Sequence, residues 1–176
     1  MSNLNNKLLI ENIYTNIVKT SRNKNFFLDF QVNDTVEGRF DVIILHSFMV
    51  FNFFIHVKDN KSEIPQNLFD HMFKDFDSNL REMGFGDIAV NKRMKQFIKA
   101  FYGRISNYSK SLSLFKESGD DTLLKETILR NIYKESKVEN RCVNFWKEYI
   151  ISNIEHFNKN TLSRNIETLF LFKGLD

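Results

Sequence analysis

Residues that interrupt helices or cross-link the chain are scarce in this sequence. Its 176 residues include one proline, six glycines and one cysteine. Because proline and glycine end helices and form tight turns, their scarcity favours long helices without a flexible linker between domains. A single thiol, Cys142, excludes an internal disulfide and a multi-cysteine metal site. The sequence therefore indicates a reducing compartment, with Cys142 as a small buried residue.

The sequence also lacks a long uninterrupted apolar run. Its most apolar stretch, residues 42–57, is shorter than the roughly 20 residues that a membrane span needs, and it contains His46, Asn52 and His56. We interpret this stretch as a buried helix. The first twenty residues mix Asn, Lys and Glu with apolar positions and do not resemble a signal peptide. A cytoplasmic protein is expected.

Spacings typical of catalytic sites are absent. None of the four histidines has an HExxH or ExxH neighbourhood, and the sequence has no GxSxG, GxxxxGK[ST] or GxGxxG motif. The histidines are His46, His56, His71 and His156. We therefore predict no catalytic residue, no metal and no cofactor, and a protein that is not an enzyme.

The densest group of potential metal ligands lies on one predicted helix. It consists of Asp70, His71, Asp75 and Asp77. The carboxylates point in different directions around a helix, so we interpret them as a solvated face on which Asp77 and Arg81 can pair. The alternative, an unconventional hydrolase or redox enzyme, requires a deep pocket that gathers His71, Asp75 and Arg104.

Apolar positions recur at helical spacing along nearly the whole chain. Phenylalanine alone accounts for 19 residues, and 42% of the chain is hydrophobic, which suits one compact domain with a dense core or an exposed apolar surface. The periodicity predicts a single all-α bundle over residues 1–176 with about six to seven helices. The expected helices cover residues 9–18, 34–57, 63–83, 87–115, 123–133 and 138–157, with a short seventh over 162–172.

Two of these helices carry further signals. Asp34 or Thr35 can cap the second helix, with Glu37 placed for a capping-box-like arrangement. The fourth helix has a heptad seam that is predicted to pack lengthwise along another helix of this chain, or alternatively along a partner chain. The seam consists of Met94, Ile98, Phe101, Ile105, Tyr108, Leu112 and Phe115.

The charge balance is mildly basic. A net charge of +3 is compatible with contact to anionic lipid or ribosomal RNA, and it falls short of a dedicated nucleic-acid binder, so no DNA partner is expected. A basic face opens the fourth helix at Lys92, Arg93, Lys95 and Lys99. Such a face can hold phosphate from RNA or lipid headgroups; the alternative is a solvated surface.

Two stretches resemble a known family. They are DTVEGRFDVIILH at residues 34–46 and LFDHMFKDFDSNLREMGFGDIAVNKRMKQFIKAFYGR at residues 68–104. Both are similar to the ubiquinol–cytochrome c chaperones of alphaproteobacteria and mitochondria, and a looser similarity extends over residues 9–133. The resemblance implies a helical, non-catalytic assembly chaperone that binds newly made cytochrome b for ubiquinol–cytochrome c reductase.

The resemblance also bears on location and partners. Mitochondrial members act with a small partner subunit near the ribosomal tunnel exit. This chain begins without their N-terminal extension, so the bacterial form is the better analogy, peripheral to the inner membrane. The alternative function is a non-catalytic interaction module that docks on the ribosome or an anionic membrane through the basic helix.

Within the two stretches we single out two sets of residues. The predicted client-binding surface comprises Met72, Phe73, Phe76, Met83, Phe85 and Met94, because adaptable Met and Phe side chains suit an apolar client. The charges of the motif are Asp34, Arg39, Asp41, Asp75, Arg81, Asp87 and Arg104. Arg39 and Asp41 flank the entrance to the most apolar helix, so each is expected to have a partner among Asp34, Asp87 and Arg104.

Overall fold

The structure is a computed structural model that describes residues 3–56, 63–159 and 170–174. In these residues the chain forms seven helices and no strand, which confirms the all-α prediction. The helices are α1 (Asn3–Ser21), α2 (Asn25–Leu28), α3 (Val36–His56), α4 (Ile64–Glu82), α5 (Asp87–Ser118), α6 (Thr122–Ile132) and α7 (Asn140–Lys159). The six long helices match expected ones, whereas the short α2 was not predicted.

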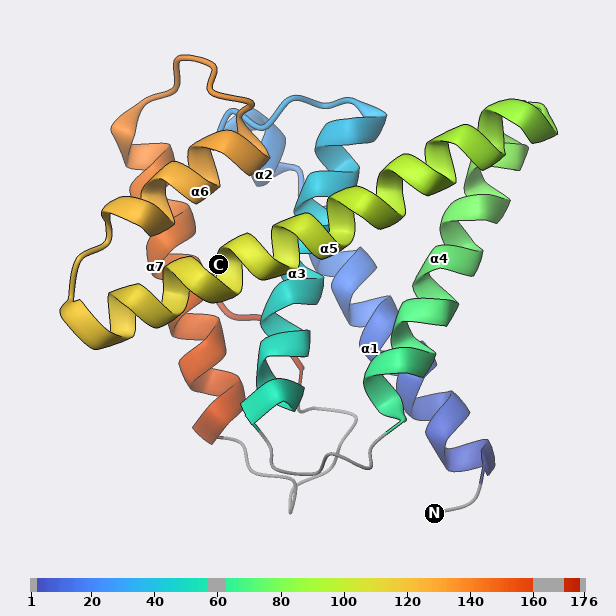
Figure 1. Ribbon diagram of the computed structural model, residues 1–176, viewed down its shortest axis with the longest axis horizontal. Helices are drawn as coiled ribbons and strands as arrows, with labels where there is room; N and C mark the ends of the chain where they lie inside the picture. Colours follow the sequence, from blue (N-terminus) through green and yellow to red (C-terminus); the bar gives the residue numbers. More distant parts are fainter. Residues whose placement is uncertain (1–2, 57–62, 160–169, 175–176) are drawn as a thin grey trace.

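Helix α3 is the central element. It packs against α1, α5, α6 and α7, while α4 packs between α1 and α5. In Figure 1, α5 crosses in front of α3, with α4 on one side and α6 and α7 on the other. Segment Val36–Ile55 is the one described helix long and apolar enough to cross a membrane, but 72% of its apolar window is buried inside the bundle. Its neighbours therefore cover it as a core helix.

The start of α3 depends on two residues of the first motif stretch. Thr35 Oγ1 accepts a hydrogen bond of 3.0 Å from the Gly38 N–H, so Thr35 is the cap. The expected capping box does not form, because Gly38 and not Glu37 stands three residues after the cap, and the Thr35 N–H donates to the Asn33 carbonyl. Glu37 accepts a hydrogen bond from Arg93. A Cβ atom on Gly38 would lie 2.0 Å from the carbonyl oxygen of Asn33. Only glycine lets the preceding loop approach the helix so closely.

The buried stripe of α5 matches the predicted seam only in part, because Met94, Ile105 and Phe115 are half-buried and Ile98 is exposed. Phe101, Tyr108 and Leu112 are buried as expected, and the helix packs within this chain. Ile98, however, is 37% exposed, and Phe97 is buried in its place. The reason is that Phe97 stacks on Phe40 of α3 with ring centroids 3.9 Å apart, which turns this part of α5 toward α3.

A fully buried histidine joins α1, α3 and α7. His46 Nδ1 lies 2.8 Å from the carbonyl oxygen of Val42 and 3.1 Å from Ser21 Oγ. Its Nε2 lies 2.9 Å from the Tyr149 hydroxyl. Because a carbonyl can only accept, Nδ1 carries the proton, and Nε2 accepts from Tyr149. Burial lowers the pKa of His46 from 6.5 to about 4, so the ring is neutral.

The end of the described chain packs against this region. Phe172 meets the His46 ring edge-on at 4.8 Å, and Phe170 is buried against Phe157. Asn153 accepts a hydrogen bond of 2.8 Å from the Lys173 N–H. The helix expected over residues 162–172 falls mostly outside the described residues, and residues 170–174 are irregular.

Candidate functional site

A groove of about 400 Å³ opens between α1, α3, α4 and the first part of α5. Apolar side chains form most of its walls: Val18, Val36, Phe40, Ile43, Phe76, Leu80, Met83 and Phe97. Its polar groups are Tyr14, Ser21, Arg22, Arg39, Asp75 and Asn79. Except for the residues of α1 and Arg22 directly after it, every lining residue comes from one of the two motif stretches.

Three aromatic rings hold the helices together at the base of the groove. Phe40 of α3 stacks on Phe97 of α5 and meets Phe76 of α4 edge-on, with centroids 5.3 Å apart. Such aromatic pairs add to the stability gained by burying their area. At the lip, Met83 ends α4 and is 59% exposed. The groove therefore has a fixed base and an adaptable thioether at its edge.

One end of the groove has a hydrogen-bonded acid. Asp75 accepts a hydrogen bond of 2.6 Å from the Tyr14 hydroxyl and one of 2.8 Å from Asn79 Nδ2. Burial and the neighbouring carboxylate raise the pKa of Tyr14, so its hydroxyl stays protonated. Arg22, which lines the same part of the groove, is exposed and forms no ion pair with a described residue. The polar rim thus keeps one cation available to a bound molecule.

The exposed motif charges pair with acids of their own motif stretch. Arg39 makes two hydrogen bonds to Asp34, of 2.6 and 3.0 Å, which provides its expected partner. Arg81 bridges Asp77 and Asp87, so it ties the end of α4 to the start of α5. These pairs are at least partly exposed and contribute little to stability individually. The Arg81 pairs span the turn between α4 and α5, and the Arg39 pair lies at the start of α3.

Asp41 is the buried charge of the motif. Its side chain is 1% exposed, and Arg104 Nη2 lies 2.6 Å from it, which confirms the expected pairing. Lys134 also donates to Asp41, from a turn in which Lys134 and Glu135 have left-handed φ angles of 53° and 62°. The cluster joins α3 and α5 to the turn after α6.

The alternative enzyme site requires a pocket that gathers His71, Asp75 and Arg104, and the groove contains only Asp75 of the three. Asp75 and His71 both contact Tyr14, whereas Arg104 pairs with Asp41 and does not line the groove. Within the described residues, no group of three or more His, Cys, Asp or Glu side chains could hold a metal ion.

Comparison with known proteins assigns the family. The profile of the ubiquinol–cytochrome c chaperones matches residues 28–165, which is most of the chain. The chain belongs to the ubiquinol–cytochrome c chaperone family. Its structure also resembles the crystal structure of the Cbp3 homolog from Brucella abortus, with 29% sequence identity and a TM-score of 0.75, over 94% of this chain and 87% of that one. None of the curated proteins compared with the chain matches it.

For this chaperone the predicted client surface needs correction. Met72 and Phe73 are buried, because Met72 packs against Ser47 of α3 and Phe73 against Phe101 of α5. Neither can contact a client in this conformation. Phe76 and Met83 do line the groove. The other two predicted residues, Phe85 and Met94, are partly buried outside it.

Sequence reasoning missed the walls that α1 and α3 supply. Val18, Val36 and Ile43 line the groove, and none of them is among the predicted site residues. No sequence signal separates them from the fully covered positions beside them.

One of the four residues of the predicted basic face, Arg93, is paired within the protein. Lys92, Lys95 and Lys99 are exposed. Arg93 instead donates to Glu37 at 2.9 Å, and its guanidinium lies 4.5 Å from the centre of the Phe85 ring. Arg93 therefore attaches α5 to α3, and the three lysines remain as the exposed cations of the predicted face.

Proposed function

We propose that this ubiquinol–cytochrome c chaperone binds the newly made cytochrome b subunit through the groove and promotes assembly of ubiquinol–cytochrome c reductase. The observation that supports the proposal is the origin of the groove walls. Both motif stretches that resemble the family converge there, although residues 34–46 and 68–104 are separated in the sequence.

The chemistry of the groove suits an apolar client. Its walls are aliphatic and aromatic: Val18, Val36 and Ile43 are half-buried and Met83 is exposed, above the buried rings of the base. Contact with such walls does not depend on a particular client sequence. A volume of about 400 Å³ lies within the range of ligand-binding clefts and holds a few side chains rather than a complete membrane helix. One face of a client segment would therefore enter the groove, with Arg22 and Asn79 available to polar groups of the client.

A pair of matched variants tests this role. Met83→Asp places a carboxylate at the lip of the groove, and Leu28→Asp places one at another exposed apolar position, 72% exposed and outside the groove. Both positions lie at the C-terminal end of a helix, so their local effects on folding are comparable. An unpaired carboxylate in an apolar interface is strongly unfavourable.

Tagged chaperone is recovered from cells in which it is the sole copy, and co-purified cytochrome b is quantified. We expect Met83→Asp to recover at least about tenfold less cytochrome b than the unmodified chain, and Leu28→Asp to recover the same amount. Thermal unfolding of both variants shows whether each is folded. Equal recovery by a folded Met83→Asp variant would reject the groove as the client site.

A further inference from the structure

Helix α5 has an unusual charge distribution. From Ile88 to Lys116 it contains no Asp or Glu, and its cations are Lys92, Arg93, Lys95, Lys99, Arg104, Lys110 and Lys116. The two arginines point inward and pair with Glu37 and Asp41. None of the five lysines forms an ion pair among the described residues, and all five are exposed. The exposed surface of α5 is therefore positively charged from Lys92 to Lys116 and has no acid of its own in that range.

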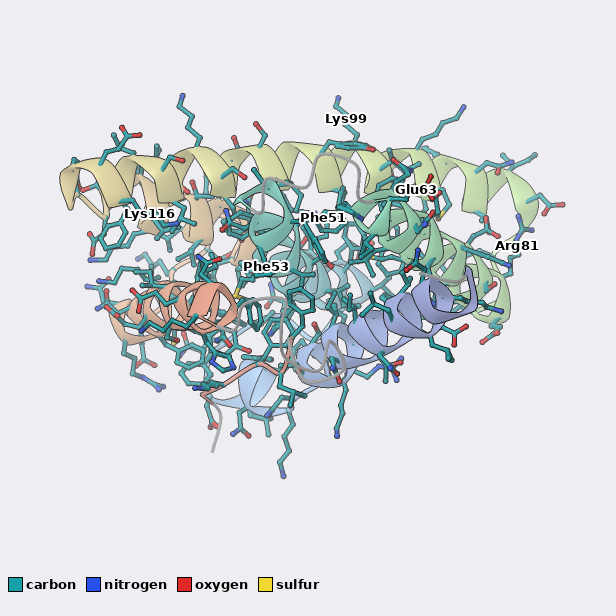
Figure 2. All side chains as sticks on the ribbon, turned by 90° about the horizontal axis from the view of Figure 1, so that it is seen from below. Phe51, Phe53, Glu63, Arg81, Lys99 and Lys116 are labelled. Carbon is teal, nitrogen blue, oxygen red and sulfur yellow. The ribbon has the colours of Figure 1, made fainter. Side chains whose placement is uncertain are left out.

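Four of these lysines lie on one side of the helix. At about 100° per residue, Lys92, Lys95, Lys99 and Lys110 fall within roughly 60° of one another. The groove residue Phe97 lies on the opposite side of α5. We call the side with the four lysines the outer face of α5. Figure 2 shows α5 along one edge of the molecule, with Lys99 pointing away from the helices beneath it.

Exposed apolar side chains accompany the lysines. Ile88 is 89% exposed and lies on the outer face one turn before Lys92, and Tyr102 is 57% exposed at the edge of the face. From Ile88 to Lys110 the face extends about 33 Å in a straight line. Gly103, Ser106 and Ser113 are the small residues along it, so little projects between the lysines.

We propose that the outer face of α5 docks the protein on an anionic phospholipid bilayer. The lysines contact headgroup phosphates, and Ile88 and Tyr102 enter the interfacial layer, where aliphatic side chains and tyrosine are both favoured. A long straight face matches an extended flat surface. The inference does not depend on client binding, because the groove and the outer face occupy opposite sides of α5.

The composition of the face favours lipid over RNA. Proteins that bind single-stranded RNA stack bases on several aromatic or arginine side chains. Here both arginines of the helix are engaged in ion pairs within the protein, and Tyr102 is the one aromatic side chain that the outer face offers in the described structure. An 89% exposed Ile88 has no partner on RNA but gains free energy in the interfacial layer of a membrane.

The test is flotation of the full chain with vesicles of phosphatidylcholine containing phosphatidylglycerol, compared with pure phosphatidylcholine. The test variant replaces Lys92, Lys95 and Lys99 by Glu. A control variant replaces Lys24, Lys74 and Lys137 by Glu; these are exposed, lie off α5 and form no ion pair with a described residue. Each triple exchange changes the net charge from +3 to −3.

Each lysine near an anionic surface strengthens binding about fivefold, so loss of three should weaken it at least roughly a hundredfold. We expect the α5 variant to lose flotation with anionic vesicles and the control to keep most of it, with all three proteins showing the same melting temperature. Binding by the unmodified chain should fall as salt rises and be weak on pure phosphatidylcholine. Ile88→Ser with Tyr102→Ser should weaken flotation at constant charge.

Three results would overturn the proposal: no flotation of the unmodified chain with anionic vesicles, equal losses in the two triple variants, or lysine-dependent binding of ribosomes without binding of vesicles. Recovery of cytochrome b from detergent extracts separates this proposal from the client-binding one. The α5 variant should recover it normally, because detergent removes the need for docking, whereas Met83→Asp should not.

Discussion

His46 lies wholly inside the bundle, and its protonation in acid is expected to destabilise the fold. The ring is 0% exposed and sits among Phe26, Trp146, Tyr149 and Phe172. Burial lowers its pKa from 6.5 to about 4. Its nearest polar partners are uncharged, so no carboxylate compensates an imidazolium there.

The sign and size of the effect follow from the two pKa values. Between about pH 6.5 and pH 4 the unfolded chain binds a proton at this site and the folded chain does not. The contribution of His46 to stability is therefore complete above about pH 6.5 and is lost as the pH falls. One pKa unit corresponds to about 1.4 kcal/mol, so the loss is about 2 kcal/mol at pH 5 and about 3 kcal/mol at pH 4.

The assay is urea unfolding of the original chain and of His46→Gln at pH 7 and pH 5. Glutamine does not titrate, and its side-chain carbonyl can accept from the Tyr149 hydroxyl. The variant should be less stable at pH 7, because the ring packing is lost, but it should lose about 2 kcal/mol less between the two pH values. Identical pH dependence of the two proteins would refute the assignment of a buried neutral His46.

Five further substitutions test the packing and the buried ion pair. Gly38→Ala should destabilise the fold by about 2 kcal/mol or more in urea unfolding, because the Cβ of the alanine would meet a loop carbonyl. Gly103→Ala should stabilise the fold by about 0.5–1 kcal/mol, because there is open space around this helical position. Phe101→Ala should cost about 3–5 kcal/mol through a core cavity, and an unchanged denaturant midpoint would contradict its burial. Arg104→Met should lower the free energy of unfolding by about 3–5 kcal/mol, because it leaves the buried Asp41 carboxylate poorly paired. Lys134→Met should lower it by about 1 kcal/mol or less, because the Lys134 side chain is 45% exposed. A larger loss for Lys134→Met than for Arg104→Met would contradict this account.

The two proposed surfaces give the chaperone separable functions. The groove faces the interior side of α5 through Phe97, and the lysines of the outer face project from the other side. A client segment in the groove and a membrane at the outer face would therefore not compete for the same residues. Variants of Met83 and of the three lysines should consequently have different defects.

The sequence by itself determined the six long helices and several of their ends, but not the short α2. The apolar periodicity predicted the long helices. Local signals mark several boundaries: Pro65 lies in the first turn of α4, Gly84 has a positive φ just after α4, Gly86 precedes α5, and Thr35, one of the two predicted caps, caps α3. Such signals act between residues a few positions apart. The motif charges were also predictable in part, since the two charges at the entrance to the apolar helix needed partners.

Tertiary structure decided which apolar residues remain accessible and which distant groups meet. Met72 and Met83 are equally apolar in the sequence, yet one is buried beneath α3 and the other is at the lip of the groove. Lys134 reaches Asp41 from 93 residues away, without any local signal. Coverage of a helix face depends on the rotation and offset of helices that are remote in the chain, and a periodic pattern fixes neither.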